Sequence, residues 1–300
     1  MSSTIEWLIV DWGTSNFRAF AMDSDGALID KIERNMGLLQ VEQGQFAQRL
    51  EQELRAWLGE YQQLPVFMAG MVGSAQGWVD VPYVETPVSI GQLAEQCHRF
   101  TLPWGAQAVI IPGVSTVDEH GIPDVMRGEE VQLFGLLALS GQSSLHAAFP
   151  GTHSKHIHAK DGQLLGFNTF MTGELFSVLS KHTILGRGLP EQQSAEPAFL
   201  RGVNESGSAV LSSRLFSTRT HRLFGNLPEE QVMDYLSGLI IGEELRQFDS
   251  KALQLVGGQG LCKRYALACR ELGLDSQFVS GDEAFLAGML KIKEVMSDDK

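Results

Sequence analysis

Two short glycine-threonine turns have the residue types that bind phosphate. Gly13-Thr14-Ser15 and Gly151-Thr152-His153-Ser154 each lie between two segments of β-strand composition. Backbone N–H groups and hydroxyls in such turns donate hydrogen bonds to phosphate oxygens, and two of these turns favour a polyphosphate held from both sides. We therefore expect a nucleotide to be bound by Gly13, Thr14, Ser15, Gly151, Thr152, Ser154 and the adjacent Lys155.

Two carboxylates are placed where phosphoryl chemistry would need them. Asp11 stands directly before the first turn, where its carboxylate could orient Mg²⁺ through water. Glu129 opens an expected helix, Glu129–Leu139, so its structural alternative is simple capping of the helix dipole. A carboxylate at that junction could also serve as general base for a hydroxyl nucleophile. We take Glu129 as the base, with Glu130 and Asp124 as the alternatives.

A third glycine turn, Gly257-Gly258-Gln259-Gly260, follows the strand Ala252–Val256 and opens a helix. Glycines allow a ligand to approach the backbone closely. A dinucleotide fingerprint would sit in an early βαβ unit with an acidic residue about 20 residues further on. Because this turn comes late in the chain, we expect Gly257 and Gly258 to border the adenosine of a nucleotide instead.

The elements that position these residues occur twice. Asp25-Gly26 and Asp161-Gly162 mark hairpins, and each follows one of the glycine-threonine turns. This internal repeat predicts two related domains, 1–142 and 143–300, each opening with a β-meander, and strands and helices alternate as in the α/β class. The expected strands of the two meanders are Trp7–Trp12, Phe17–Asp23 and Ala27–Arg34, then Leu145–Phe149, Lys155–Ala159 and Gln163–Phe167.

Hydrophobic spacing predicts helices over Gln45–Tyr61, Gly91–Phe100 and Ser208–Phe224, and a short apolar run predicts a strand over Val66–Ala69. His153, His156 and His158 form a cluster after the second turn. Their alternation along an expected strand puts His156 and His158 on one face and His153 elsewhere, so we interpret them as structural and expect no metal other than Mg²⁺.

Composition excludes several classes of function. The 300 residues carry 23 Lys and Arg against 36 Asp and Glu, a formal charge of −13. With no basic block, neither a nucleic acid nor a membrane surface is expected as partner. Three cysteines without a C-x-x-C pair and an N-terminus without a signal-peptide pattern predict a cytoplasmic protein. An anionic substrate would need local cations, for which Arg18, Arg127 and Lys155 are candidates; Lys155 could equally neutralise the γ-phosphate.

The order of these motifs resembles the sugar kinases of the actin-like ATPase superfamily, over nearly the whole chain. Those kinases carry a G-D-Q-x-A-x-x-G segment whose Asp is the base, and Gly128-Glu129-Glu130 occupies its place with Glu for Asp. The segments that carry the resemblance are Asp11–Ser15, Arg127–Glu130, Pro150–Lys155, Val256–Gly260 and Asp282–Gly288.

Within that superfamily the chain is most similar to the 2-dehydro-3-deoxygalactonokinase family, through Met68–Ser74, Met126–Glu130 and Thr169–Phe176. The resemblance implies a two-domain actin-like ATPase fold, with duplicated ribonuclease H-like domains and an interdomain cleft. It also implies ATP-dependent phosphorylation of 2-dehydro-3-deoxy-D-galactonate at O6, with Mg²⁺, in D-galactonate catabolism. Gly73, Ser74 and Trp78, in the loop Gly70–Trp78, are then expected to contact the sugar acid, together with Arg18 and Arg127.

Two other functions remain open on the sequence. A kinase for another sugar or sugar acid, such as 2-dehydro-3-deoxy-D-gluconate, would share every phosphate-binding element. A non-catalytic ATP-binding module would bind ATP without sugar-stimulated turnover. The sequence leaves homo-oligomerisation open as well.

Overall fold

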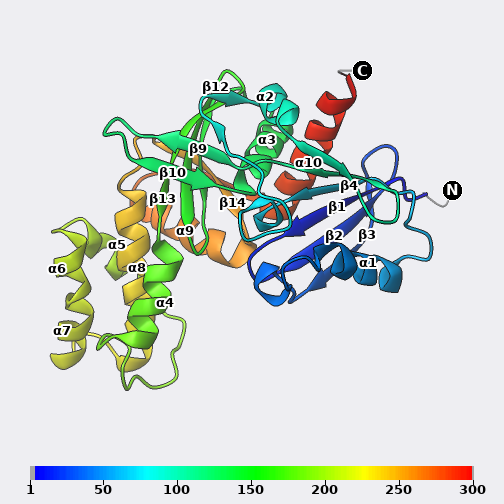
Figure 1. The fold of residues 1–300 in the computed structure, drawn as a ribbon. Helices are drawn as coiled ribbons and strands as arrows, with labels where there is room; N and C mark the ends of the chain where they lie inside the picture. The colour runs from blue at the N-terminus through cyan, green and yellow to red at the C-terminus, as the bar shows by residue number, and fades with distance from the viewer. Residues whose placement is uncertain (1–3, 299–300) are drawn as a thin grey trace. The chain divides into compact units, whose positions relative to one another are not determined.

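The computed structural model describes residues 4–298, which form two compact units (Figure 1). The first unit comprises the chain up to Ser143, Lys160–Gly166 and the residues from Asp282 onward; the second comprises Ser144–Ala159 and Phe167–Gly281. The last helix, which the predicted domain 143–300 includes, thus belongs with the first unit.

The first unit is built on a mixed sheet with the strand order β3-β2-β1-β4-β8-β7. Strands β1, β2 and β3 form the predicted antiparallel meander, while β4 lies parallel to β1, and β8 parallel to β4. Strands β1 and β4 are buried along almost their whole length, as expected for central strands covered on both faces. The bounds are β1 Trp7–Trp12, β2 Phe17–Met22, β3 Leu28–Arg34, β4 Val66–Ala69, β7 His98–Thr101 and β8 Gln107–Ile110.

The second unit repeats this arrangement. Its strands follow the order β15-β14-β11-β12-β13, with β11 and β12 antiparallel and β14 parallel to β11 and β15. Position by position this matches β8-β4-β1-β2-β3, so the internal repeat predicted from the two glycine-threonine turns is confirmed in the topology. The bounds are β11 Leu145–Phe149, β12 Ser154–Lys160, β13 Gln163–Phe170, β14 Ala252–Gly257 and β15 Asp275–Ser280.

Short strands complete the first unit. The strands β10, β9 and β5 form a small three-stranded sheet. Strand β6 pairs with the first residues of β13, which are counted with the first unit. The bounds are β5 Val84–Glu85, β6 Val88–Ser89, β9 Val114–Val117 and β10 Pro123–Met126.

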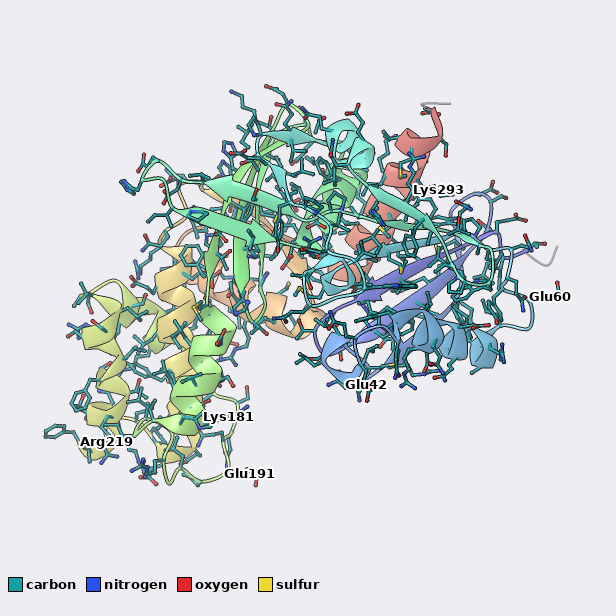
Figure 2. The ribbon with its side chains drawn as sticks, in the orientation of Figure 1. Glu42, Glu60, Lys181, Glu191, Arg219 and Lys293 are labelled. Carbon is teal, nitrogen blue, oxygen red and sulfur yellow. The ribbon has the colours of Figure 1, made fainter. Side chains whose placement is uncertain are left out.

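Helix α1 covers one face of the first sheet (Figure 1). Its buried residues Phe46, Leu50 and Leu54 are four apart and lie on one side of the helix. Glu42 and Glu60, labelled in Figure 2, lie just outside its two ends. The helix predicted over Gly91–Phe100 is wrong in its second half, because α2 ends early and β7 follows as an edge strand. The bounds are α1 Phe46–Trp57, α2 Ile90–Glu95, α3 Glu129–Ser140 and α10 Gly281–Asp298.

Helices α3 and α10 lie in backbone contact within the first unit. A methyl group at Gly135 would overlap the carbonyl oxygen of Ala284, and one at Gly288 would overlap that of Val131. Glycine at both positions lets the helix axes approach closely. The position of Glu129, at the start of α3, is therefore tied to the last helix of the chain.

Helices extend the second unit beyond its sheet, with α5 packed along α8 (Figure 1). The single helix predicted over Ser208–Phe224 is two helices, α6 and α7, joined at Phe216, and α5 was not predicted. In Figure 2, Lys181 and Arg219 mark α4 and α7. No helix in the described range 4–298 is long and apolar enough to span a membrane. The bounds are α4 Thr172–His182, α5 Glu196–Ser206, α6 Leu211–Leu215, α7 Ser217–Leu223, α8 Val232–Leu245 and α9 Gln259–Glu271.

Candidate active site

The parallel strands of the first unit bring several predicted segments to one edge of the sheet. β1 and β4 are in register from Leu8↔Val66 to Asp11↔Ala69, so the first glycine-threonine turn and the loop Gly70–Trp78 leave the sheet side by side. In α/β sheets, ligands bind beyond the carboxyl ends of such strands. A Cβ at Gly70 would lie 3.2 Å from Oδ1 of Asp11, and one at Gly128 would lie 3.7 Å from Cα of Gly70. The structure thus brings the first turn, the loop and the Arg127–Glu130 segment together.

Backbone contacts fix the shape of the first turn. The N–H of Gly13 donates to the carbonyl of Asn16 over 2.9 Å, and the carbonyl of Gly13 accepts from the N–H of Leu38 over 3.0 Å. A side chain at Gly37 would overlap the backbone of Thr14 and Ser15, so this position requires glycine. The side chains of Thr14 and Ser15 are left exposed.

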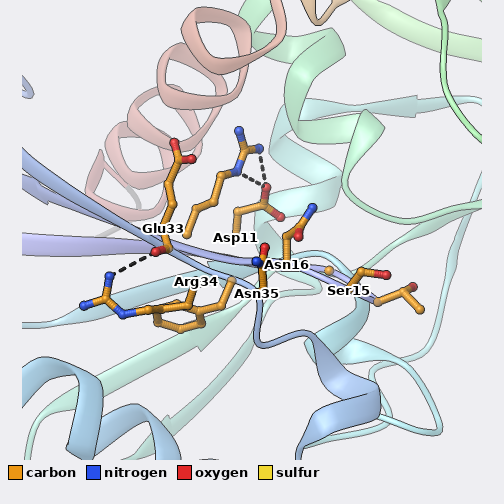
Figure 3. Close-up of a pocket in the computed structure, with 10 residues that line it drawn as sticks. Asp11, Ser15, Asn16, Glu33, Arg34 and Asn35 are labelled. Carbon is orange, nitrogen blue, oxygen red and sulfur yellow. Dashed lines mark hydrogen bonds and ion pairs between the residues drawn. The ribbon is translucent and has the colours of Figure 1, made fainter.

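A cavity of about 730 Å³ opens beside this turn (Figure 3). Asp11, Gly13, Thr14, Ser15 and Arg18 line it, as expected of a site at this edge. Its other polar lining residues were not predicted from the sequence. One of them, Asn16, directly follows Ser15 in the sequence. The others reach the cavity through the register of β2 with β3, in which Phe17 is paired with Arg34, so the Asp25-Gly26 hairpin was a signal that could have indicated them. These lining residues are Asn16, Glu33, Arg34 and Asn35.

Arg18 is held between two carboxylates of the first unit. Its Nε donates to Oδ2 of Asp11 over 3.0 Å, and its two terminal nitrogens form ion pairs with Asp11 and Asp282. These partners differ from the substrate carboxylate expected for Arg18. Burial raises the pKa of Asp11 above its usual value even though the Arg18 charge opposes the shift.

The loop Gly70–Trp78 is half inside the core. Ser74 is buried and its hydroxyl donates to the carbonyl of Met71 over 2.7 Å. The ring of Trp78 packs between Phe46 and Phe100, with centroids 6.3 and 5.3 Å away. Of the three predicted sugar contacts in this loop, Ser74 and Trp78 therefore have structural partners of their own, and Gly73 adjoins Arg127.

Arg127 is buried next to this loop, with 9% of its surface exposed. Its Nη2 donates to the carbonyl of Val81 over 2.8 Å, and the guanidinium lies 4.4 Å from the ring centroid of Tyr83. Nε and Nη1 have no hydrogen-bond partner within the described residues. A Cβ at Gly73 would lie 2.9 Å from Nη1, so the guanidinium abuts the loop directly.

The three candidates for the base have different surroundings. Glu130 is buried, and both of its carboxylate oxygens accept from the N–H of Gly128, over 2.9 and 2.7 Å. Burial, and secondarily the charge of Glu129, raises the pKa of Glu130 to about 8. Glu129 is half-buried at the first position of α3, and Asp124 lies on β10 of the small sheet. Of the two carboxylates at the start of α3, Glu129 is thus the one that solvent can reach.

In the second unit the two predicted nucleotide turns are neighbours. β11 and β14 run parallel with Ala148 opposite Leu255, so the turn after each strand lies at the same sheet edge. A Cβ at Gly257 would lie 3.6 Å from the carbonyl oxygen of Pro150. Gly257 has a φ of +154°, a conformation that favours glycine, whereas Gly258 has φ −72° and open space around it.

The second glycine-threonine turn packs against the start of α4. A Cβ at Gly173 would lie 2.5 Å from the carbonyl oxygen of Gly151, and the N–H of Glu174 donates to the carbonyl of Thr152 over 3.1 Å. Glu174 also bonds Nε2 of His153 over 2.5 Å. Like the first turn, this one is thus shaped by backbone packing against a glycine.

Three side chains beyond the second turn are bonded inside the second unit. Ser154 is fully buried and its hydroxyl donates to Glu244 over 2.6 Å, so this hydroxyl has a protein partner instead of the expected phosphate. Lys155 is 5% exposed, and its Nζ donates to Oγ1 of Thr169 over 2.5 Å. His156 bonds Glu244 as well, while His158 stacks on His146. Among the described residues, no group of three or more His, Cys, Asp or Glu is arranged to hold a metal ion.

The duplicated fold and its two glycine-threonine turns indicate the class of protein. Two copies of one sheet order, each with a glycine-threonine turn at the carboxyl edge, are the duplicated α/β architecture of the actin-like ATPases. The comparison with component A of (R)-2-hydroxyglutaryl-CoA dehydratase from Acidaminococcus fermentans agrees at the level of the fold. That structure has a TM-score of 0.50 at 13% identity and covers 97% of this chain and 99% of its own.

The family follows from closer relatives. The family model described as 2-keto-3-deoxy-galactonokinase matches residues 11–292, and the chain belongs to this family. It is 37% identical to the 2-dehydro-3-deoxygalactonokinase of Escherichia coli strain K12, over 98% of this chain and 100% of the relative. A solved structure from Sinorhizobium meliloti, provisionally assigned as a 2-dehydro-3-deoxygalactonokinase, has a TM-score of 0.89 at 34% identity and covers 97% of this chain and 99% of its own.

Proposed function

We propose that this protein transfers the γ-phosphoryl group of ATP to O6 of 2-dehydro-3-deoxy-D-galactonate, giving the 6-phosphate and ADP. One observation carries the proposal: the family match spans residues 11–292, and thus includes every predicted site residue. The reaction would be a step of D-galactonate catabolism. Free and buried Cys97, Cys262 and Cys269 agree with a reducing, cytoplasmic setting.

In this proposal the first unit holds the sugar acid and carries out the proton transfer. Glu129 takes the proton of the C6 hydroxyl while that oxygen bonds to the γ-phosphorus, and the bond from γ-phosphorus to its bridging oxygen breaks, releasing ADP. The half-buried position of Glu129 supports this role, because Glu130 is enclosed and bonded to Gly128. The loop of Gly73, Ser74 and Trp78 would shape the sugar site through its backbone.

Mg²⁺ fits the donors at the carboxyl end of β1. Asp11 lines the cavity together with the side-chain oxygens of Thr14, Ser15 and Asn16, and hard oxygen donors of this kind suit Mg²⁺. When bound, the ion would neutralise charge on the phosphates. Asp11 would orient it through water, and Arg18 would hold the Asp11 carboxylate in place.

The carboxylate of the sugar acid needs a cation, and Arg127 is the better supported candidate. Arg18 already faces Asp11 and Asp282, whereas two N–H groups of Arg127 have no partner among the described residues. A guanidinium binds a carboxylate through paired hydrogen bonds. Because these N–H groups are buried, the sugar loop beside Gly73 would have to shift when the substrate enters.

The second unit would hold the nucleotide. The amides of Gly151 and Thr152 would bind phosphate, and Gly257 and Gly258 would border the adenosine, since both turns lie at one sheet edge. Lys155 would add positive charge near the γ-phosphate. Ser154 would act through its buried hydroxyl, by holding the turn in place.

Replacement of the base tests the mechanism. Glu129→Gln should lower kcat by about 10²–10⁴-fold, since a positioned general base contributes that much. ATP should bind as in the wild type. Asp124, one of the two alternative candidates for the base, lies on β10 and not on α3, so Asp124→Asn is the comparison and should retain most activity if Glu129 is the base. A Glu129→Gln variant with near-normal kcat would remove Glu129 as the base.

Substrate identity is tested by ADP release with Mg-ATP against 2-dehydro-3-deoxy-D-galactonate, its gluconate epimer, D-galactonate, glycerol and D-xylulose. Turnover with the galactonate derivative alone supports the proposal. Preference for the epimer or a neutral sugar would overturn the substrate and keep the kinase. ATP binding without turnover on any of them would favour a non-catalytic module.

A further inference from the structure

Glu244 on α8 is a buried carboxylate at the centre of a polar cluster in the second unit. Only 2% of its surface is exposed. The cluster contains four further side chains, and they come from β12, α4 and α9. None of the motifs discussed for the sequence includes Glu244.

The hydrogen bonds to this carboxylate are complete. Oε1 accepts from the hydroxyl of Ser154 over 2.6 Å and faces Nε2 of His156 at 2.8 Å. Oε2 accepts from the hydroxyls of Thr172 and Tyr265 over 2.5 and 2.6 Å. Four partners fill the four acceptor positions of a carboxylate. A buried charge is costly without such partners, so the site is built to keep this group in one place.

Each hydroxyl partner belongs to a segment that adjoins a proposed nucleotide turn. Ser154 is the last residue of the second glycine-threonine turn and the first of β12. Thr172 begins α4, the helix whose Gly173 and Glu174 contact that turn. Tyr265 lies on α9, the helix that starts after Gly258. One carboxylate therefore links the three segments that would surround ATP.

A second carboxylate in the same unit shows what a purely structural cluster looks like. Glu205 on α5 bonds Tyr235 over 2.5 Å, Arg201 over 2.8 Å and His221 over 3.0 Å. These partners lie on α5, α7 and α8, and none of them belongs to a predicted nucleotide turn. Glu205 is therefore a matched control for Glu244.

We infer that Glu244 is a positioning residue for the nucleotide half of the site: its carboxylate holds the second turn, the start of α4 and α9 in the arrangement that binds the ATP phosphates and adenosine. The inference rests on the proposed function in its assignment of nucleotide to these turns. It adds a residue that acts through Ser154, Thr172 and Tyr265 and does not touch the ligand.

The test is Glu244→Gln, measured in the full-length protein by calorimetric titration with ADP and by steady-state kinetics. The ADP Kd and the KM for ATP should rise about tenfold, because the neutral amide weakens several hydrogen bonds to a charged group, and such bonds contribute on the order of that factor. The KM for the sugar acid should stay within about twofold of wild type. Glu205→Gln should lower the thermal midpoint and leave the ADP Kd unchanged.

Single-donor variants keep the test valid if Glu244→Gln does not fold. Tyr265→Phe and Thr172→Val each remove one hydrogen bond, and each should raise the ADP Kd about three- to tenfold. Unchanged ADP binding in the folded variants overturns the inference, as does an equal rise in both KM values. ADP titration needs no sugar acid, so a wild type that binds ADP but turns over no substrate contradicts the proposed function and still permits this test.

Discussion

The two glycine-threonine turns stand on the same sheet topology but have different chemistry at their bases. In the first unit the cross-strand neighbours below the turn are Asp11 and Arg18, an acid and a base in an ion pair. In the second unit the corresponding neighbours are Phe149 and Lys155. The residue opposite Lys155 in the strand register is thus apolar, and the Nζ of Lys155 donates to Oγ1 of Thr169. Only the first turn has a carboxylate at the end of its strand.

The support beneath each turn differs in the same way. Arg18 and its two carboxylates are partly exposed beside the cavity, where charge can meet a ligand. The hydroxyl of Ser154 and the carboxylate of Glu244 are enclosed. A duplicated scaffold can thus have solvent-accessible charged side chains beneath one turn and an enclosed hydrogen-bonded cluster beneath the other. In the proposed reaction these correspond to phosphoryl transfer and nucleotide binding.

Among the substitutions that compare the two turns, removal of the acid below the first turn should have the largest effect. Asp11→Asn should lower kcat about 10–100-fold, because groups that orient a bound metal typically contribute that much. Phe149→Leu, at the corresponding place in the second unit, should change kcat less than about twofold. Steady-state kinetics at saturating Mg²⁺ would measure both. Equal effects of the two substitutions would contradict the asymmetry between the turns.

Arg127 tests whether the first unit recognises the substrate's carboxylate. Arg127→Lys keeps the charge but loses the planar fork, and we expect the KM for the sugar acid to rise about tenfold. The KM for ATP should not change. Arg34→Lys is the control, since Arg34 lines the cavity but is paired with Glu53. A rise in both KM values would indicate a structural role for Arg127.

Gly258 tests whether the second unit binds the nucleotide. Its φ is −72° and a Cβ there would meet nothing within 4 Å, so Gly258→Ala should leave the thermal midpoint unchanged. If the adenosine lies against it, the methyl group should raise the KM for ATP about three- to tenfold. Gly260→Ala, which also has open space, is the comparison. An unchanged KM would place the adenosine elsewhere.

Substitution of Glu130 should change the stability of the fold and not catalysis. We expect this effect to be the smallest of the four. The pKa of Glu130 rises from 4.5 to about 8 on folding, so its contribution to stability is fully present below pH 4.5 and is lost as the pH rises through 8. Glu130→Gln stays neutral and can still accept from Gly128. In thermal unfolding, the midpoint of the variant should rise relative to that of the wild type as the pH increases from 5 to 9. A constant difference across that range would contradict the raised pKa.

Local patterns predicted the meanders and the turns well. Trp7–Trp12, Val66–Ala69 and Leu145–Phe149 were predicted with the bounds that the structure has, because apolar runs between turn residues are short-range signals. Helix α5 was missed, and Ser208–Phe224 was taken as one helix, because tertiary packing on α8 decides those elements. The resemblance to the kinase family came from motifs spread along the chain, each of them local.

Interaction partners from distant segments of the chain could not be predicted from the sequence. Nothing near Arg18 in the sequence indicates that Asp282, 264 residues further on, is its second partner. Glu244 lies within an apolar helix, and its proposed positioning role depends on four side chains from other elements. Glu33, Arg34 and Asn35 line the cavity because β3 is paired with β2. Contacts between residues far apart in the sequence therefore limited how much of the site could be predicted.

The contribution of α10 to the first unit has a consequence for synthesis. Phe285 packs on Phe20, Leu290 lies against Gly26, and Gly288 fits against α3. The strands made first thus lack part of their covering until α10 has left the ribosome. The second unit, complete at Gly281, has all of its sequence available earlier. We expect a nascent chain to form the second unit before the first is complete, and thus the proposed nucleotide-binding part before the proposed sugar-acid-binding part.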